Sequence, residues 1–308
     1  MTISVKGFSQ SDLTLYDMMN NPITHNPAYT GVTDSYFFKL SHSSQWVGFE
    51  GAPKTQILDF QKKFYNQRNA LGVSIINDEF GAIRNTNIEL NYSFHTNVSY
   101  NTNLVLGLKA GYNDLNVDYS LLNIYDPTES IYLQDNISKP LPLIGAGFYI
   151  SNQEFWFAAS VSNFIQKKIE DENSEHIFRK RSHGYFNFGY LFYLSDSFDL
   201  RTQFLGQIVR GGPVDIIYNA EVEFEQKFSF SININPNSHA GIGTGFNFAG
   251  NGRISYGYNI GIRDVGVYSN GNHLISLSYF IEGSRNSFSN YRGYKNGKML
   301  NRRPYIMR

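Results

Sequence analysis

Apolar and polar residues alternate along most of this chain. Between Ile88 and Phe94, apolar side chains occupy every second position and the positions between them are Glu, Asn and Ser. The same alternation runs through 103–113, 214–225, 228–234 and 254–263. Successive side chains of a β-strand point to opposite faces, so this pattern predicts strands with one apolar face and one polar face.

Extending the pattern along the chain predicts fourteen strands, most of them long enough to cross a membrane at a tilt. They lie near 35–43, 54–62, 69–77, 84–95, 102–116, 140–150, 154–163, 182–194, 198–209, 214–225, 227–233, 238–249, 252–264 and 272–282. The longest connections, 117–139 and 164–181, follow odd-numbered strands, whereas the shortest follow even-numbered ones. Long loops at one end and tight turns at the other are typical of an outer-membrane barrel.

A soluble sandwich is the main alternative, because its strands also alternate. Two features favour the membrane barrel. The polar face is mostly Gly, Ser and Asn, which suits a narrow lumen, and the apolar face carries Phe and Tyr near strand ends, as in aromatic girdles. We therefore predict an all-β, single-chain antiparallel transmembrane β-barrel of about 14 strands with an N-terminal plug-like segment.

Composition agrees with a membrane barrel and excludes several other classes. Charged residues make up only 17% of the chain, Tyr and Phe number 22 and 25, and Cys is absent. The formal net charge of zero gives no argument for nucleic-acid binding. No apolar run reaches the roughly 18 residues of a transmembrane helix, so only a closed barrel could satisfy its backbone groups in lipid.

The organisation along the chain divides into four parts. Residues 1–10 are expected to be a signal-peptide remnant, with an ordinary cytosolic N-terminus as the alternative. An irregular plug-like segment is expected over 11–34 and the barrel over 35–282. Residues 283–308 hold seven basic residues and no acidic one. This tail is expected to be solvated and periplasmic, where it could contact peptidoglycan or a partner.

Two motifs near the N-terminus are distinctive enough to compare with known protein families. One is N-P-x-x-x-N-P-A-x-x-G, from Asn21 to Gly31, and the other is Q-W-x-G-F-x-G-A-P-x-T, from Gln45 to Thr55. Together they resemble the PorP/SprF family of type IX secretion. The resemblance spans about residues 12–282, and its sharp motifs lie in the first 85. Asn-Pro pairs restrict the backbone, so the first motif also predicts a rigid entry into the barrel.

The resemblance implies an outer-membrane protein of Gram-negative Bacteroidetes that docks or anchors secreted cargo such as gliding-motility adhesins at the cell surface. Both termini are expected to be periplasmic, which places the long connections outside the cell. The implied partners are a secreted protein with a type IX C-terminal domain, periplasmic type IX or peptidoglycan-associated components, and outer-membrane lipid. A porin or small-molecule channel is the alternative. Loops 44–53, 117–139 and 164–181 and the upper lumen would recognise the cargo. Residues of the two motifs are the candidates for contact with cargo. The structural alternative is that they form a plug and a folded loop that close the barrel. They are Asn26, Pro27, Tyr29, Gly31, Gln45, Trp46, Gly48, Phe49, Gly51 and Pro53.

Charged residues on the polar faces are expected in the lumen: Glu89, Lys109, Glu221, Glu223 and Arg263. Glu221, Glu223 and Glu225 alternate along one strand. Their carboxylates could bind cations, or pair across the lumen with Arg201, Lys227 or Arg263.

An enzyme is not expected, because the chain lacks a nucleophile elbow, a phosphate-binding loop and zinc-ligand spacing. Ser43 and Ser44 follow His42, but seven histidines make such neighbours common by chance. We predict no catalytic residue, cofactor or metal site.

Overall fold

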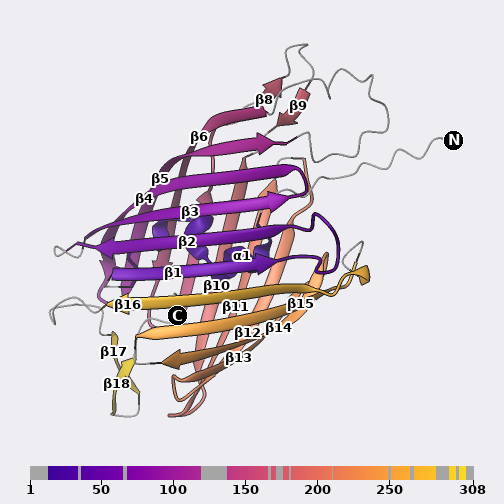
Figure 1. Ribbon diagram of the computed structural model, residues 1–308. Coiled ribbons are helices and arrows are strands. Elements are labelled where there is room, and N and C mark those ends of the chain that lie inside the picture. The colour runs from indigo at the N-terminus through magenta and orange to yellow at the C-terminus, as the bar shows by residue number, and fades with distance from the viewer. Residues whose placement is uncertain are drawn as a thin grey trace, which may run out of the picture.

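Fourteen antiparallel strands close into a barrel in this computed structural model (Figure 1). Their bounds are β1 Tyr36–Ser44, β2 Lys54–Lys63, β3 Asn69–Phe80, β4 Ile83–Ser99, β5 Thr102–Val117, β6 Ile137–Ser151, β7 Phe155–Val161, β10 His183–Tyr193, β11 Phe198–Val209, β12 Asp215–Phe224, β13 Phe228–Asn235, β14 His239–Phe248, β15 Gly252–Gly261 and β16 Asn272–Ile281. β1 pairs with β16 from Tyr36–Ile281 to Ser44–His273, which closes the ring. The prediction of a 14-stranded barrel is confirmed.

The structure describes residues 13–33, 36–64, 68–118, 137–165, 168–170, 176–179, 182–209, 211–248, 251–263, 267–281, 291–295 and 298–302. Two small hairpins lie outside the barrel sheet, and only their backbone is described: β8 Lys168–Glu170 with β9 His176–Arg179, and β17 Tyr291–Lys295 with β18 Lys298–Arg302. The expected signal remnant, most of loop 117–139 and half of loop 164–181 fall outside these residues. Part of the basic tail forms the β17–β18 hairpin.

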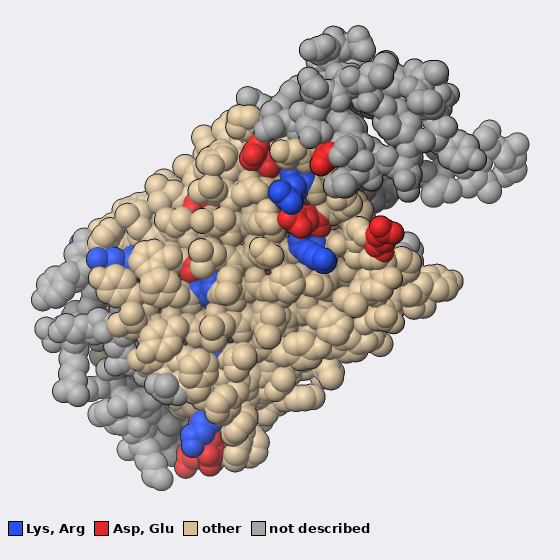
Figure 2. All heavy atoms as spheres, viewed as in Figure 1, with Lys and Arg blue, Asp and Glu red and all other residues tan. Residues whose placement is uncertain are grey.

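The alternation sorts side chains to the two faces of the wall as the sequence predicts. On β4, Leu90 is 52% exposed on the outside, whereas Glu89 and Asn91 are buried inside. β13 repeats the pattern, with Phe230 and Ile232 outside. Figure 2 shows a wall that is largely free of charged side chains, which gather mainly toward its ends. Such a surface is suited to lipid.

The two ends of the barrel carry different connections. Turns such as 152–154, 194–197 and 225–227 join strands at one end, which we call the short-turn end. The opposite end, called the long-loop end, carries connections such as 45–53, 162–182 and 262–271. This is the asymmetry that the sequence predicts.

Three short helical turns precede β1: α1 Leu15–Asn20, η1 Pro22–Thr24 and η2 Pro27–Tyr29. They lie within the ring of strands (Figure 1). None of the helices in the described ranges has the length and apolar character needed to cross a membrane.

Candidate functional site

Residues 13–33, which we call the plug, fill much of the barrel interior. Local chemistry folds them. The Thr14 side chain caps α1 by accepting a hydrogen bond from the Asp17 backbone N–H at 3.1 Å. Each 3-10 turn begins at a proline, and Asn26 accepts from the Ala28 N–H at 2.9 Å ahead of the second turn. These turns keep the plug compact enough for the lumen.

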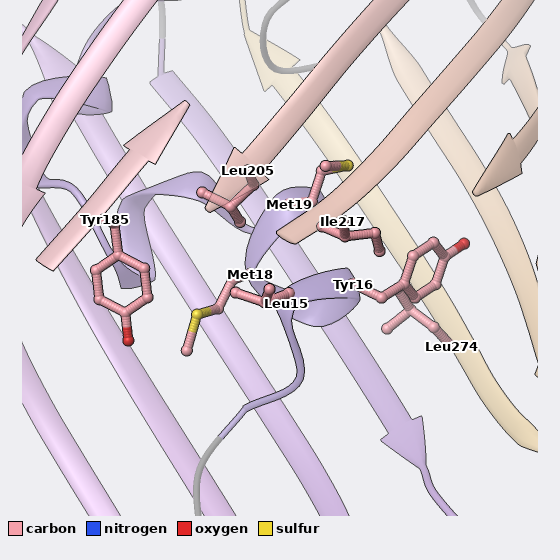
Figure 3. Packing of buried hydrophobic residues seen from close by; sticks show 8 residues of the cluster. All are labelled: Leu15, Tyr16, Met18, Met19, Tyr185, Leu205, Ile217 and Leu274. Carbon is pink, nitrogen blue, oxygen red and sulfur yellow. The ribbon is translucent and has the colours of Figure 1, made fainter. Parts of the chain in front are cut away.

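The plug crosses the lumen from the long-loop end toward the short-turn end. Figure 3 shows its first turn, α1, packed against Tyr185, Leu205, Ile217 and Leu274. Three of these four wall residues lie two positions from the long-loop ends of their strands. Near the C-terminal end of the plug, the Gly31 N–H donates to the Gln61 side chain at 3.0 Å, close to the short-turn end of β2.

Wall side chains hold the plug mainly through its backbone carbonyls. Lys109 Nζ donates to Thr24 O at 2.6 Å, and Lys39 Nζ donates to Asn20 O. The hydroxyls of Ser160 and Ser93 donate to His25 O and Thr30 O, at 2.8 and 2.7 Å. His95 Nε2 also lies 3.0 Å from Thr30 O, and together these side chains come from four strands, β1, β4, β5 and β7.

Wall glycines make this close approach possible. A Cβ at Gly107 would overlap the backbone of Ala28, and one at Gly147 would overlap the Asn26 side chain. The same holds for Gly257 against Tyr16. Any larger residue at these positions would push the plug away from the wall.

The four predicted contact residues of the plug are all inside the barrel. Asn26, Pro27 and Tyr29 are buried, and Gly31 has a left-handed φ of 68° that suits glycine. Asn26 Nδ2 donates to the Phe148 carbonyl at 3.1 Å. The Tyr29 hydroxyl donates to Asn187 Oδ1 at 3.2 Å, an oxygen that also accepts from Trp156 Nε1 at 2.7 Å. Their contacts are with the wall, as the structural alternative describes.

The six predicted loop residues form a folded element at the long-loop end, which we call the rim loop (45–53). Gln45 N–H donates to Pro53 O at 2.9 Å, which closes the loop on itself. Val47 exchanges backbone hydrogen bonds with 270–271 across the rim. Gly48 and Gly51 have φ values of 104° and 70°, which glycine adopts without strain.

The two aromatic residues of the rim loop have different environments. Trp46 packs edge-on against Phe80, with ring centroids 6.3 Å apart. Phe49 is 44% exposed at the rim. The two rings therefore differ: Trp46 packs against Phe80, whereas Phe49 is turned outward.

Four of the five predicted lumen charges lie in the barrel interior. Lys109 Nζ is 2.6 Å from Glu89 Oε2. Glu221 pairs with Arg201 and, at 3.0 Å, with Arg253 Nη2, and Glu223 is also buried.

The prediction of Arg263 as a lumen charge is wrong, because it lies beyond the end of β15 and is exposed. Glu225 does not continue the strand that carries Glu221 and Glu223, although the sequence predicts that it does. It sits in the turn after β12 with a φ of 47°. Arg253 was not predicted as a lumen charge, although its position on the polar face of β15 indicates one.

A small, partly enclosed chamber lies between the plug and the wall. Six plug residues and twelve wall residues line it, and its surface is mostly polar. Tyr16, Lys39, Arg201, Glu221 and Arg253 are among them.

Sequence comparison shows the family. A model of the family "Type IX secretion system membrane protein PorP/SprF" matches residues 7–279. The chain belongs to the PorP/SprF family. No curated protein matches the sequence.

Solved structures show what this PorP/SprF barrel is similar to in fold. The "CymD monoaromatic hydrocarbon channel" has a TM-score of 0.53 at 12% identity, covering 85% of this chain and 92% of that one. The toluene transporter TbuX of Ralstonia pickettii has a TM-score of 0.52 at 11% identity, covering 85% and 94%. Both are barrels of the outer-membrane type, and at this identity the likeness concerns the fold alone.

Three serine–histidine pairs of the described part of the PorP/SprF barrel lie within hydrogen-bonding distance: His42 with Ser44, Ser93 with His95, and Ser238 with His239. His42 Nε2 lies 3.1 Å from Ser44 Oγ, and their alternate positions on β1 place both on the outer face. Among the described residues, no group of three His, Asp or Glu is placed to hold a metal ion.

Proposed function

We propose that this PorP/SprF protein docks secreted cargo of the type IX system at the outer membrane and holds it at the cell surface. The long-loop end would face outward and the short-turn end would face the periplasm, following the usual asymmetry of such barrels. In this orientation α1, the start of the plug, lies toward the outer side, which departs from the expected periplasmic N-terminus. The cargo would be a secreted protein with a type IX C-terminal domain, such as a gliding adhesin. Periplasmic type IX or peptidoglycan-associated components would meet the short-turn end.

The observation that carries this proposal is the rim loop. Backbone hydrogen bonds fix it against 270–271, and it presents the exposed ring of Phe49. A rigid aromatic residue on an ordered loop is a common anchor of protein interfaces. The plug supports the same proposal, because a barrel that binds proteins needs no open pore.

The test is affinity purification of the tagged barrel from native outer membrane. We expect secreted proteins to co-purify, and Phe49→Ala to reduce their yield without changing barrel stability. Tyr100→Ala is the matched control, because Tyr100 is fully exposed in a turn at the opposite end. Equal yields from both variants would remove the rim loop from the proposed interface, and a tagged wild-type barrel without secreted partners would overturn the docking function.

A small-molecule channel is the second candidate. The polar chamber beside the plug favours it, and two structural neighbours are named as a channel and a transporter. The docking proposal predicts little ion conductance for the intact chain in planar bilayers and a clear increase when 13–33 are deleted. High conductance of the intact chain would favour the channel.

A further inference from the structure

The wall recognises the plug largely through groups that every peptide has. Lys39, Lys109, Ser93 and Ser160 all donate to backbone carbonyl oxygens of the plug. A carbonyl oxygen is the same whatever the side chain, so these contacts select a peptide backbone and not a plug sequence. Main-chain hydrogen bonds are a general basis of affinity in peptide recognition.

A row of asparagine side chains on the wall beside the plug has amide atoms without hydrogen-bond partners among the described residues. Asn219, Asn233 and Asn259 point inward from β12, β13 and β15. Asn219 is paired with Asn233 across neighbouring strands, and Asn233 and Asn259 are both paired with Gly241 of β14. Asn233 and Asn259 are only 4% and 2% exposed. Both amide atoms of Asn233 and the Oδ1 atoms of the other two have no hydrogen-bond partner among the described residues. We call these three residues the amide row.

Such a row is unusual, because buried polar groups in folded proteins nearly always have partners. Tyr16 of α1 reaches the next inward positions, with its hydroxyl beside Gly243 and Gly257. α1 therefore covers this part of the wall without satisfying its amides. An amide side chain offers both a donor and an acceptor, which is the pair that a peptide unit needs.

Lys39 and Ser43 of β1 form hydrogen bonds to Asn20 O and the Asp17 side chain of α1, and the other contacts of α1 are mainly apolar and exchangeable. This helix has six residues and packs with Leu15, Met18 and Met19 on wall side chains (Figure 3). Methionine adapts readily to different partners. The polar chamber adjoins α1 and reaches Asn219 of the amide row, which leaves space along this wall.

We propose that α1 is a removable occupant, and that the amide row and the chamber bind an extended peptide segment of the secreted partner in its place. This rests on the proposed docking function. The second half of the plug stays bound through Lys109, Ser160 and Ser93, and α1 leaves its position. Peptide N–H and C=O groups then pair with Asn219, Asn233 and Asn259.

The absence of cysteine from the chain allows a direct test. Asn21 follows α1, and its Oδ1 lies 2.8 Å from Ser41 Oγ on β1. In Asn21→Cys/Ser41→Cys, a disulfide would fix α1 to the wall. We expect the yield of co-purifying secreted protein to be at least about tenfold lower for the oxidised variant, and reduction to restore that yield.

A second disulfide provides the matched control. The pair Thr55→Cys/Asp78→Cys joins β2 to β3, where the native side chains are 2.6 Å apart, and leaves the plug free. We expect equal yields from this variant in its oxidised and reduced forms. Gel mobility with and without heating would verify that both variants fold. Equal yields from the oxidised and reduced plug-locked variant would overturn the proposal.

A photo-crosslinking residue provides an independent measurement. Placed at Asn233, it should capture secreted protein in the native membrane. Capture at Phe49 but not at Asn233 would show docking on the rim alone and would overturn the peptide site while preserving the docking function. Capture at neither position, together with no co-purifying protein, would overturn the docking function itself.

Discussion

The Nζ atom of Lys109 lies 2.6 Å from Glu89 Oε2, and both side chains are almost completely buried. The same ammonium group donates to Thr24 O of the plug at 2.6 Å. One cation therefore joins two wall strands and the plug. A buried pair of this kind is strongly destabilised when one partner is removed, because the other charge remains desolvated.

Lys109→Met should lower the free energy of unfolding by about 3–5 kcal/mol, because Glu89 would be left buried and unpaired. Urea unfolding in detergent, followed by tryptophan fluorescence, measures this change. Arg84→Met is the control, since Arg84 pairs with Glu79 at 3.0 Å but is 66% exposed. It should change stability by less than about 1 kcal/mol. Equal effects of the two substitutions would contradict a structural role of the buried pair.

Gly107→Ala should displace the plug, because the new Cβ would overlap the backbone of Ala28. We expect a rise in ion conductance across planar bilayers and faster proteolysis within 13–33. Gly184→Ala is the matched control on another strand, where the nearest atom to an added Cβ is 3.8 Å away. Conductance that stays at the wild-type level in Gly107→Ala would mean that the wall tolerates the methyl group without moving the plug.

Plug stability should depend on pH through Asp17. Burial raises the pKa of this carboxyl to about 6, although hydrogen bonds from Thr14 and Ser43 oppose the rise. The folded plug thus favours the neutral form. The stabilisation is complete below the unfolded pKa of about 3.9 and is lost as the pH rises through about 6.

We therefore expect plug protection against proteolysis to fall between about pH 4 and pH 7. Asp17→Asn should remove most of this dependence, because the amide does not ionise. Asp196→Asn, in an exposed turn, should leave it unchanged. An unaltered pH profile in Asp17→Asn would assign the dependence to another group.

The outward pair His42 and Ser44 should have no hydrolase activity. The two side chains are 3.1 Å apart, but we find no sequence motif for a catalytic nucleophile around them. Folded barrel should not release fatty acid from phospholipid vesicles, and Ser44→Ala should behave as wild type. Release that Ser44→Ala abolishes would show that the pair is catalytic.

The sequence by itself determined the strands and their two faces. Alternation has a period of two because of strand geometry, so local sequence is enough to place Leu90 outside and Glu89 inside. The Asn-Pro motif likewise marked the segment that became the plug, since proline restricts the backbone locally. These features depend on neighbours in the chain.

Only the tertiary structure decided which lumen residues meet. Arg253, and not Arg263, reaches Glu221, because strand register and barrel closure set the level of each inward side chain. The contact between Lys109 and Thr24 joins residues 85 positions apart. Val47 of the rim loop likewise pairs with 270–271, more than 220 positions further along the chain. Such pairings arise only when the ring closes, so no local pattern encodes them.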